Sequence, residues 1–245
     1  MKKKIVSLAL AVCLLAIAAV GTLAYFTDKD AADNVFVTGN VKIDLKENFG
    51  DNDPTTPEKL VPCTGSAQNG TLENGIKKEV SVKNIGTEDA YVRVHIAIPA
   101  VLDNGNPDFD AGKNTLHFNY APESVGEGKW DWSKTADDGK YEGNWNYYET
   151  EIDNVKYNVY VVTYTTALKA GEETADKAMT QVYLDKNTSN EAIQSYIDTL
   201  GTNWHILVLA EGCQAAGFDN AYDALNTAFK APGTYTPDFS GAVLG

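Results

Sequence analysis

The segment Ala90–Pro99 constrains the fold more strongly than any other part of the sequence. Apolar side chains occupy every second position of it, at Val92, Val94, Ile96 and Ile98. The intervening positions hold Tyr91, Arg93, His95 and Ala97. Successive side chains of a β-strand point to opposite faces, so this period of two predicts a strand with one apolar face.

Similar patterns recur along the chain and predict further strands. They cover residues 41–46, 79–83, 116–120, 144–152, 155–166, 179–184 and 204–210. The short link 84–89 is rich in turn-forming residues, and Asp153 and Asn154 form a two-residue link that tolerates positive φ. Both links predict antiparallel neighbours.

Two short helices interrupt the strands. We expect the first to begin near Thr188, with Glu191 as its capping-box partner. The second is expected to have Asp219 as its N-cap and to stop at Pro232 and Gly233. Short helices among many antiparallel strands are typical of an all-β sandwich.

The N-terminus has the pattern of an export signal. Three lysines precede an apolar run over residues 5–20, and small side chains follow at Thr22 and Ala24. We expect cleavage before Tyr25, which makes residues 1–24 a signal peptide. The alternative is an uncleaved membrane anchor, because about 20 uncharged residues can span a bilayer.

Residues 25–245 are expected to form a single domain, because all-β domains of this size are commonly undivided. Cleavage removes three of the 20 basic residues and none of the 34 acidic ones, so the formal net charge of −14 becomes −17. Such a charge repels nucleic acid and anionic lipid, so neither is an expected partner. Contact with a membrane is expected only through the leader, before cleavage.

Two cysteines remain after export, because Cys13 leaves with the leader. Cys63 and Cys213 lie far apart in sequence, and an exported protein folds in an oxidising compartment. A disulfide between them and a pair of buried free thiols are both compatible with the sequence.

The sequence offers no constellation typical of an enzyme. His95, His117 and His205 lie on three different predicted strands, without the i, i+4 pairing of a helical zinc site. The chain also lacks a Gly-x-Ser-x-Gly nucleophile elbow, a phosphate-binding loop and a dinucleotide fingerprint. We therefore expect no catalytic residues and no cofactor, and structural roles for the three histidines.

One loop is a weak candidate for calcium binding. Its oxygen-bearing side chains alternate, at Asn104, Asn106, Asp108 and Asp110. The loop lacks the glycine and the final glutamate of an EF-hand, so a plain solvated loop is favoured.

Aromatic residues are concentrated between residues 130 and 164. Trp130, Trp132 and Trp145 could form an exposed platform that stacks on sugars, which would make the protein a glycan-binding module. The alternative is that aromatic pairs across neighbouring strands hold the sheet together. The spacing favours the alternative, because the tyrosines of this region follow the strand period.

Three parts of the chain resemble the TasA/camelysin family, whose members are processed by a SipW-type signal peptidase. They are GTLAYFTD at 21–28 with GNVKIDL at 39–45, VKNIGTEDAYVRV at 82–94, and AEGCQAAGF at 210–218. The resemblance implies a jelly-roll-like sandwich, secretion from a Gram-positive bacterium, and a structural role at the cell surface or in the biofilm matrix. It also implies a SipW-type signal peptidase as partner.

In the fibre-forming relatives, the mature N-terminal segment pairs as a strand with the next subunit. Carried onto this chain, the donor is residues 25–37, with candidate contacts at Tyr25, Phe26, Val35 and Val37. The partners would be other copies of the chain or other matrix components. The alternative is that this segment pairs within its own sandwich. Camelysin has been classed as a metallopeptidase, but this chain has no His-Glu-x-x-His motif, so we do not transfer that activity.

Overall fold

The computed structural model describes residues 40–48, 60–63, 75–103, 116–118, 129–133, 146–201, 204–239 and 242. The chain divides into the units Met1–Thr38 and Gly39–Gly245, and every described residue lies in the second.

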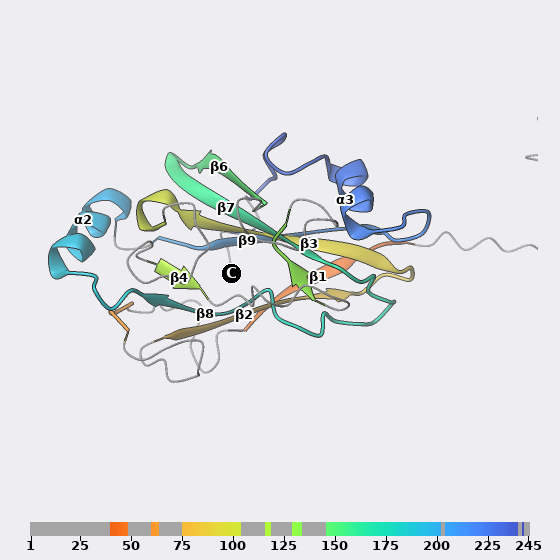
Figure 1. The fold of residues 1–245 in the computed structure, drawn as a ribbon, viewed down its shortest axis with the longest axis horizontal. Helices are drawn as coiled ribbons and strands as arrows, with labels where there is room; N and C mark the ends of the chain where they lie inside the picture. The colour runs from red at the N-terminus through yellow and green to blue at the C-terminus, as the bar shows by residue number, and fades with distance from the viewer. Residues whose placement is uncertain are drawn as a thin grey trace, which may run out of the picture. The chain divides into compact units, whose positions relative to one another are not determined.

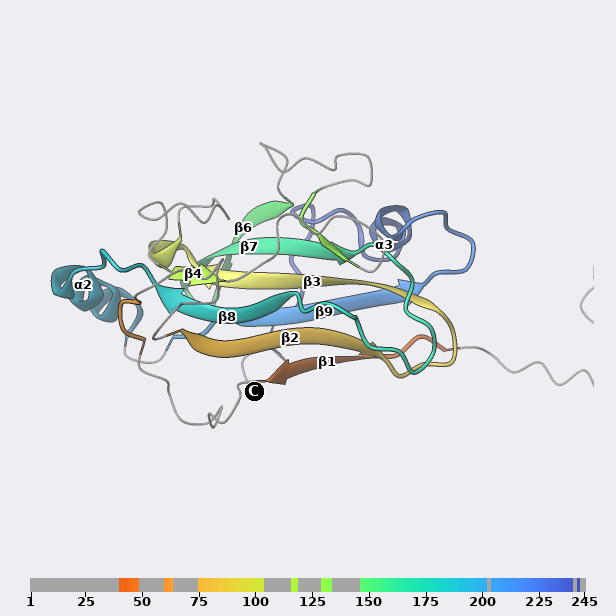
Figure 2. The ribbon, with the colours of Figure 1, turned by 60° about the horizontal axis from the view of Figure 1, so that its bottom comes forward.

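The second unit is built mainly from antiparallel strands arranged in two sheets (Figures 1 and 2). The strands are β1 (Ile43–Asn48), β2 (Ile76–Asn84), β3 (Ala90–Pro99), β4 (Leu116–Phe118), β5 (Trp130–Asp131), β6 (Tyr147–Ile152), β7 (Val155–Tyr164), β8 (Met179–Leu184) and β9 (Leu207–Gln214). One sheet has the order β1-β2-β8-β4, and the other has the order β5-β7-β3-β9, with β6 also paired to β7. The predicted all-β antiparallel sandwich is confirmed.

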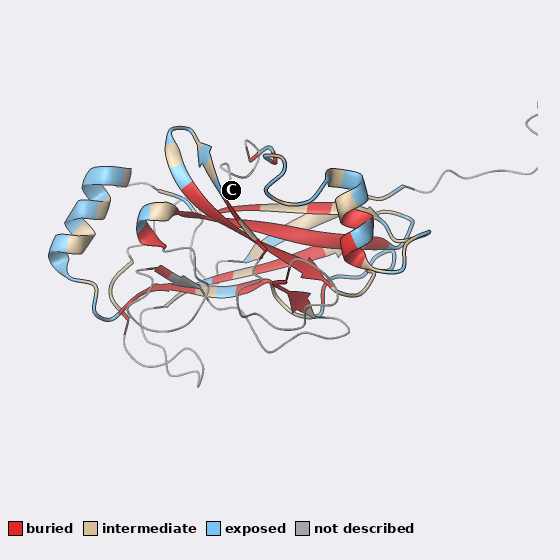
Figure 3. Ribbon diagram, turned by 45° about the horizontal axis from the view of Figure 1, so that its top comes forward, coloured by how far each residue is buried: buried red, intermediate tan, exposed pale blue. Residues whose placement is uncertain are grey.

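The main core lies between the two sheets and follows the alternation in the sequence. The inward side chains of β3, from Val92 to Ile98, are completely buried. They pack with Val80 and Val82 of β2 and with Val162 of β7. Figure 3 shows the burial of the long central strands in red. Burying each such side chain contributes about 1.5–3 kcal/mol, so this layer is the main source of stability.

The hairpin between β6 and β7 forms as predicted. Asp153 and Asn154 have φ values of 51° and 65°, both in the left-handed region. A type I′ turn needs positive φ at both central residues, and Asp and Asn tolerate it better than most side chains.

Two α-helices form among the described residues, each capped one residue later than predicted. α2 (Asn190–Leu200) has Ser189 as its N-cap, and the Ser189 side chain accepts a hydrogen bond from the backbone N–H of Ala192. The expectation of Thr188 was therefore wrong by one position. Ser189 has the extended backbone of an N-cap, with φ −79° and ψ 162°. At one end of the sandwich, α2 packs side chains such as Ile193 and Tyr196 against the main core (Figure 1).

α3 (Ala221–Phe229) is capped by Asn220, whose side chain accepts from the backbone N–H of Asp223. The prediction of Asp219 was also wrong by one position, because Asn220, like Ser189, has the extended backbone of an N-cap. α3 contacts β3, β7 and β9. A second, smaller core lies on the outer face of this sheet and is formed by Ala97, Tyr148, Tyr157, Val159, Val161, Leu207 and Phe239.

A short 3₁₀ helix, η1 (Ala100–Leu102), follows β3 directly. It turns the chain at the end of β3, and Leu102 is buried in the main core.

Candidate functional site

Within the described part of the chain β1 and β9 are edge strands, as are β4, β5 and β6, and the edges of β1 and β9 lie beside each other. β9 pairs only with β3, and β1 pairs only with β2. The two strands are in contact at Gly212 of β9 and Ile43 of β1. A Cβ atom placed on Gly212 would lie 2.7 Å from Cγ2 of Ile43. An open edge has backbone N–H and C=O groups that are not used in a ladder, so it is a natural place for another strand to add.

Apolar side chains of the core reach the surface beside these edges. Leu45 stands opposite Val82 in the β1–β2 ladder, so both side chains face the core. Val82 is completely buried, whereas Leu45 is only half-buried. Ile43 and Ala210 are also partly buried and pack against the core. The two edges thus combine free backbone groups with partly exposed apolar side chains, the two features that strand addition requires.

The chain enters β1 along a fixed path. The backbone N–H of Thr87 donates to the carbonyl of Asn40 (2.9 Å), and that of Ile85 donates to the carbonyl of Lys42 (2.7 Å). The hydroxyl of Thr87 accepts from the N–H of Asn40 (2.9 Å). Gly86 lies so close that a Cβ would be 2.4 Å from the carbonyl oxygen of Asn40, so only glycine fits there without a shift. The β2–β3 turn therefore anchors the segment that precedes β1.

The outer face of the second sheet carries a buried charged network centred on Arg93. Its Nε donates to Oε2 of Glu211 (2.6 Å). Its Nη1 donates to Oδ1 of Asn226 in α3 (3.0 Å), and Nη2 donates to the carbonyl of Lys230 (3.1 Å) and to Oη of Tyr235 (2.8 Å). Arg93 thus joins β9, α3 and the segment after α3.

His95 extends this network. Its Nε2 lies 3.1 Å from Oε2 of Glu211, and its Nδ1 lies 3.2 Å from Oη of Tyr148. Burial lowers the pKa of His95, so the ring is neutral, with Nε2–H donating to the carboxylate and Nδ1 accepting from the tyrosine. Burial alone would raise the pKa of Glu211, but hydrogen bonds from His95 and Tyr235 and the charge of Arg93 outweigh it and bring the pKa to about 2.

The histidine–carboxylate pair has no access to a substrate, because His95 is completely buried. Its geometry supports a structural role. This network could not be found from the sequence, since Arg93 and His95 meet Glu211 only through the register of β3 with β9. The strand predicted over 204–210 also ended one residue before Glu211.

The tryptophan platform is wrong for the two tryptophans that the structure describes. Trp130 and Trp132 are each only 2% exposed. Trp130 donates from Nε1 to the carbonyl of Asp176 (2.9 Å) and meets the ring of Tyr164, its cross-strand neighbour, edge-on at 5.2 Å between centroids. Trp132 packs against Tyr160. These rings belong to the core, as the alternative of cross-strand aromatic packing predicted.

The two cysteines are free, so the disulfide alternative is wrong; of the two buried thiols that the other alternative predicted, only that of Cys63 is buried. Cys63 is buried, and its N–H donates to the carbonyl of Leu184 at the end of β8, in the first sheet. Cys213 is half-buried on β9, in the second sheet. Burial raises the pKa of both thiols, that of Cys213 to about 11.

Several predicted site residues lie outside the described residues and stay predictions. They are the cleavage-site residues Thr22, Ala24 and Tyr25, the donor-strand residues Phe26, Val35 and Val37, the calcium candidates Asn104, Asn106, Asp108 and Asp110, and Trp145. In the described part of the chain, no three His, Cys, Asp or Glu side chains are grouped so that they could hold a metal ion. None of the described helices has the length and apolar character needed to cross a membrane.

No protein-family model and no curated protein matches this chain. Its function must therefore be inferred from its own sequence and geometry.

Proposed function

We propose that this protein is an exported, non-enzymatic structural component of the cell surface or extracellular matrix of a Gram-positive bacterium, and that it assembles with copies of itself by strand addition. The observation that carries the proposal is the open edge of β9 beside the partly exposed apolar side chains of Ile43, Leu45 and Ala210. The donor is the segment 25–37 of another copy, which becomes available when a SipW-type signal peptidase cleaves after Ala24.

The physical reason is complementarity between donor and acceptor. An added strand satisfies the free N–H and C=O groups of the edge, and its alternate side chains, such as Val35 and Val37, cover the apolar residues. Donor and acceptor are different surfaces of the chain, so the contact is head-to-tail and extends into a filament unless a ring closes.

Two further features support this function. The anchor formed by Asn40 and Thr87 fixes the path of the chain just after the donor segment. The sequence also resembles the TasA/camelysin family at its leader, at 82–94 and at 210–218, and that family includes matrix fibre proteins. Other matrix components are a second class of partner that the resemblance supports.

Electron microscopy of the purified mature chain, residues 25–245, tests the proposal. The mature chain is expected to form filaments, and a version without residues 25–34 is expected to stay monomeric. Ala210→Lys is expected to block assembly as well, because a lysine at the edge places a charge where the donor would bury apolar side chains.

The matched control is Thr180→Lys, which adds the same charge at an exposed position of β8 in the other sheet. It is expected to assemble normally. Equal filament formation by the mature and shortened chains would rule out strand donation, and equal assembly of the two lysine variants would rule out the β9 edge as the acceptor. Circular dichroism establishes that each variant is folded.

A further inference from the structure

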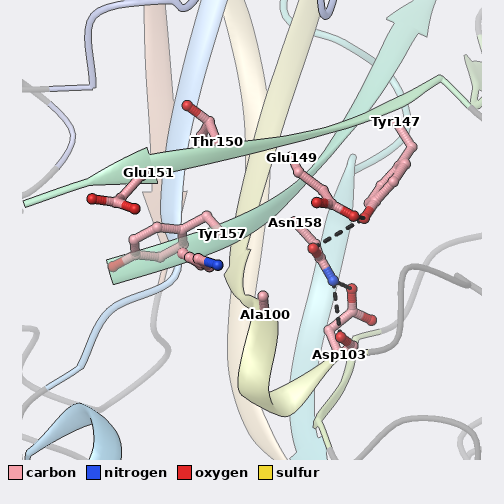
Figure 4. A pocket seen from close by; sticks show the side chains of 9 residues that line it. Ala100, Asp103, Tyr147, Glu149, Thr150, Glu151, Tyr157 and Asn158 are labelled. Carbon is pink, nitrogen blue, oxygen red and sulfur yellow. Dashed lines mark hydrogen bonds between the residues drawn. The ribbon is translucent and has the colours of Figure 1, made fainter. Parts of the chain in front are cut away.

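A cleft of about 380 Å³ opens between the β6–β7 hairpin and η1 (Figure 4). Its lining includes Ala100 of η1, Asp103, Tyr147 and Glu149 of β6, and Tyr157 and Asn158 of β7. Tyr147 and Tyr157 lie on opposite sides of it, and Ala100 lies between them. The cleft is separate from the β9 edge and from the Arg93 network.

The polar side chains of the cleft are held in place by a hydrogen-bonded chain. Nδ2 of Asn158 donates to the backbone carbonyl (2.9 Å) and to Oδ2 (2.8 Å) of Asp103. The hydroxyl of Tyr160 donates to the same Oδ2 (2.6 Å). These contacts fix the Asn158 amide so that its Oδ1 accepts from the hydroxyl of Tyr147 (3.0 Å). The orientation of the Tyr147 ring is therefore set before any ligand arrives, which lowers the cost of binding.

Glu149 presents hydrogen-bond acceptors at the rim. The Tyr147 hydroxyl also lies 3.1 Å from Oε1 of Glu149, so its single proton is shared between Oδ1 of Asn158 and this carboxylate, which lies beside the aromatic ring. Burial is the main cause that raises the pKa of Tyr147, and the neighbouring Glu149 raises it further. The phenol therefore stays protonated and acts as the donor. A carboxylate accepts several hydrogen bonds, so Glu149 has capacity left for two neighbouring hydroxyl groups of a ligand.

The charges around the cleft argue against an anionic ligand. Asp103, Glu149 and Glu151 repel an anion. Lys156 stands opposite Glu151 in the β6–β7 ladder and offsets part of the acidic charge, which reduces the attraction for a cation. The site thus combines one partly exposed aromatic ring, a small apolar floor at Ala100 and fixed acceptors in a mostly polar, acidic lining. Its volume of about 380 Å³ falls within the range of small-molecule sites, about 300–1,000 Å³.

We propose that this cleft binds a neutral sugar unit of a polysaccharide. The partly exposed ring of Tyr147 and the Ala100 methyl group contact the apolar C–H face of the pyranose, and Glu149 accepts hydrogen bonds from its hydroxyl groups. None of the buried tryptophans lines this cleft. Sugar binding in the cleft does not depend on assembly through the β9 edge.

Titrations followed by two-dimensional NMR test the proposal on the ¹⁵N-labelled mature chain without residues 25–34, which keeps the compact unit Gly39–Gly245 and is expected to stay monomeric. The probes are three neutral oligosaccharides (maltohexaose, cellohexaose and mannohexaose), with a chitosan hexamer as the cationic probe and hexagalacturonate as the anionic one. At least one neutral probe is expected to shift the amide signals of residues 147–151 and 156–158. Glu149→Gln is expected to weaken that binding about tenfold or more, because it removes a charge-assisted acceptor.

Tyr147→Phe keeps the ring but removes the hydroxyl that positions Glu149, so it is expected to weaken binding by a smaller factor. The matched control is Glu88→Gln, an exposed glutamate on the β2–β3 turn, which is expected to bind like the native chain. The proposal is overturned if none of the neutral probes shifts these signals, if only a charged probe does, or if Glu149→Gln and Glu88→Gln bind equally well.

Discussion

Arg93 on β3 and Glu211 on β9 stand opposite each other in the ladder, and Nε of the arginine donates to Oε2 of the glutamate over 2.6 Å. The two residues are only 1% and 8% exposed. The same guanidinium also bonds Asn226 and the carbonyl of Lys230, so one buried cation joins the sheet to the helix that covers it. Removing one member of a buried pair leaves an uncompensated charge, which costs far more than losing an exposed ion pair.

Arg93→Met is therefore expected to lower the free energy of unfolding by about 3–5 kcal/mol, measured by urea denaturation with tryptophan fluorescence. The control is Lys46→Met, whose partner Asp44 lies 3.1 Å away with both side chains more than 40% exposed. It is expected to cost no more than about 1 kcal/mol. The double variant Arg93→Met with Glu211→Leu should recover part of the loss. Similar losses for Arg93→Met and Lys46→Met would contradict a structural role for the buried pair.

Stability is expected to fall as the pH is lowered. In the folded state the pKa of Glu211 is about 2, below its ordinary 4.5, so the unfolded state binds a proton first and stability is lost as the pH falls through this range. Burial also lowers the pKa of His95 below its ordinary 6.5, so acidification below that value again favours the unfolded state.

Thermal unfolding between pH 8 and pH 3 measures both effects, because they act in the same direction. Tm should be highest near neutral pH. His95→Gln should flatten the curve between about pH 7 and pH 5, and Glu211→Gln should flatten it below about pH 5. A Tm that is constant from pH 8 to pH 4 in the native chain would contradict this assignment.

The strands could be predicted because their signal is local. The alternation from Val92 to Ile98 and the turn at Asp153 and Asn154 depend on neighbouring residues alone, and both are confirmed. The helix caps shifted by one residue because adjacent positions hold residues that can each cap a helix. Composition does not decide which of them adopts the extended backbone.

The buried network could not be predicted, because it depends on contacts between distant segments. Glu211 meets Arg93 and His95 through strand register, and Asn226 and Tyr235 arrive from a helix and a loop later in the chain. The burial of Trp130 and Trp132 has the same origin. A cluster of aromatic residues is compatible with a core or with a surface platform, and only the fold decides which one forms.

Gly86→Ala is expected to weaken the anchor before β1. The new methyl group would lie 2.4 Å from the carbonyl oxygen of Asn40 and 2.7 Å from the N–H nitrogen of Lys42, both backbone atoms that cannot move away easily. Overpacking of this kind costs about 1–3 kcal/mol. Hydrogen exchange should show faster exchange of the Thr87 amide, whereas Glu88→Ala in the same turn should leave it unchanged. Unchanged protection in Gly86→Ala would contradict the anchor.

Cys63 and Cys213 are expected to be reduced and slow to react in the folded chain. Burial raises the pKa of both thiols, so at pH 8 few of them are present as the reactive thiolate. Mass spectrometry after iodoacetamide treatment should find almost no adduct on the native chain and two adducts per mature chain after denaturation without reductant. A denatured chain that takes up adducts only after reduction would instead contain the disulfide.

Asn220→Ala tests which residue caps α3. The Asn220 side chain accepts from the N–H of Asp223 over 2.9 Å, so its loss leaves one donor of the first turn without its partner. The expected cost is about 1 kcal/mol in the free energy of unfolding. Asp219 is exposed and precedes the cap, so Asp219→Ala is expected to stay within about 0.5 kcal/mol of the native chain. The reverse order of these two losses in urea denaturation would show that Asp219 is the cap. Loss of the cap in Asn220→Ala is also expected to weaken the link to Arg93, whose Nη1 donates to Asn226 of α3.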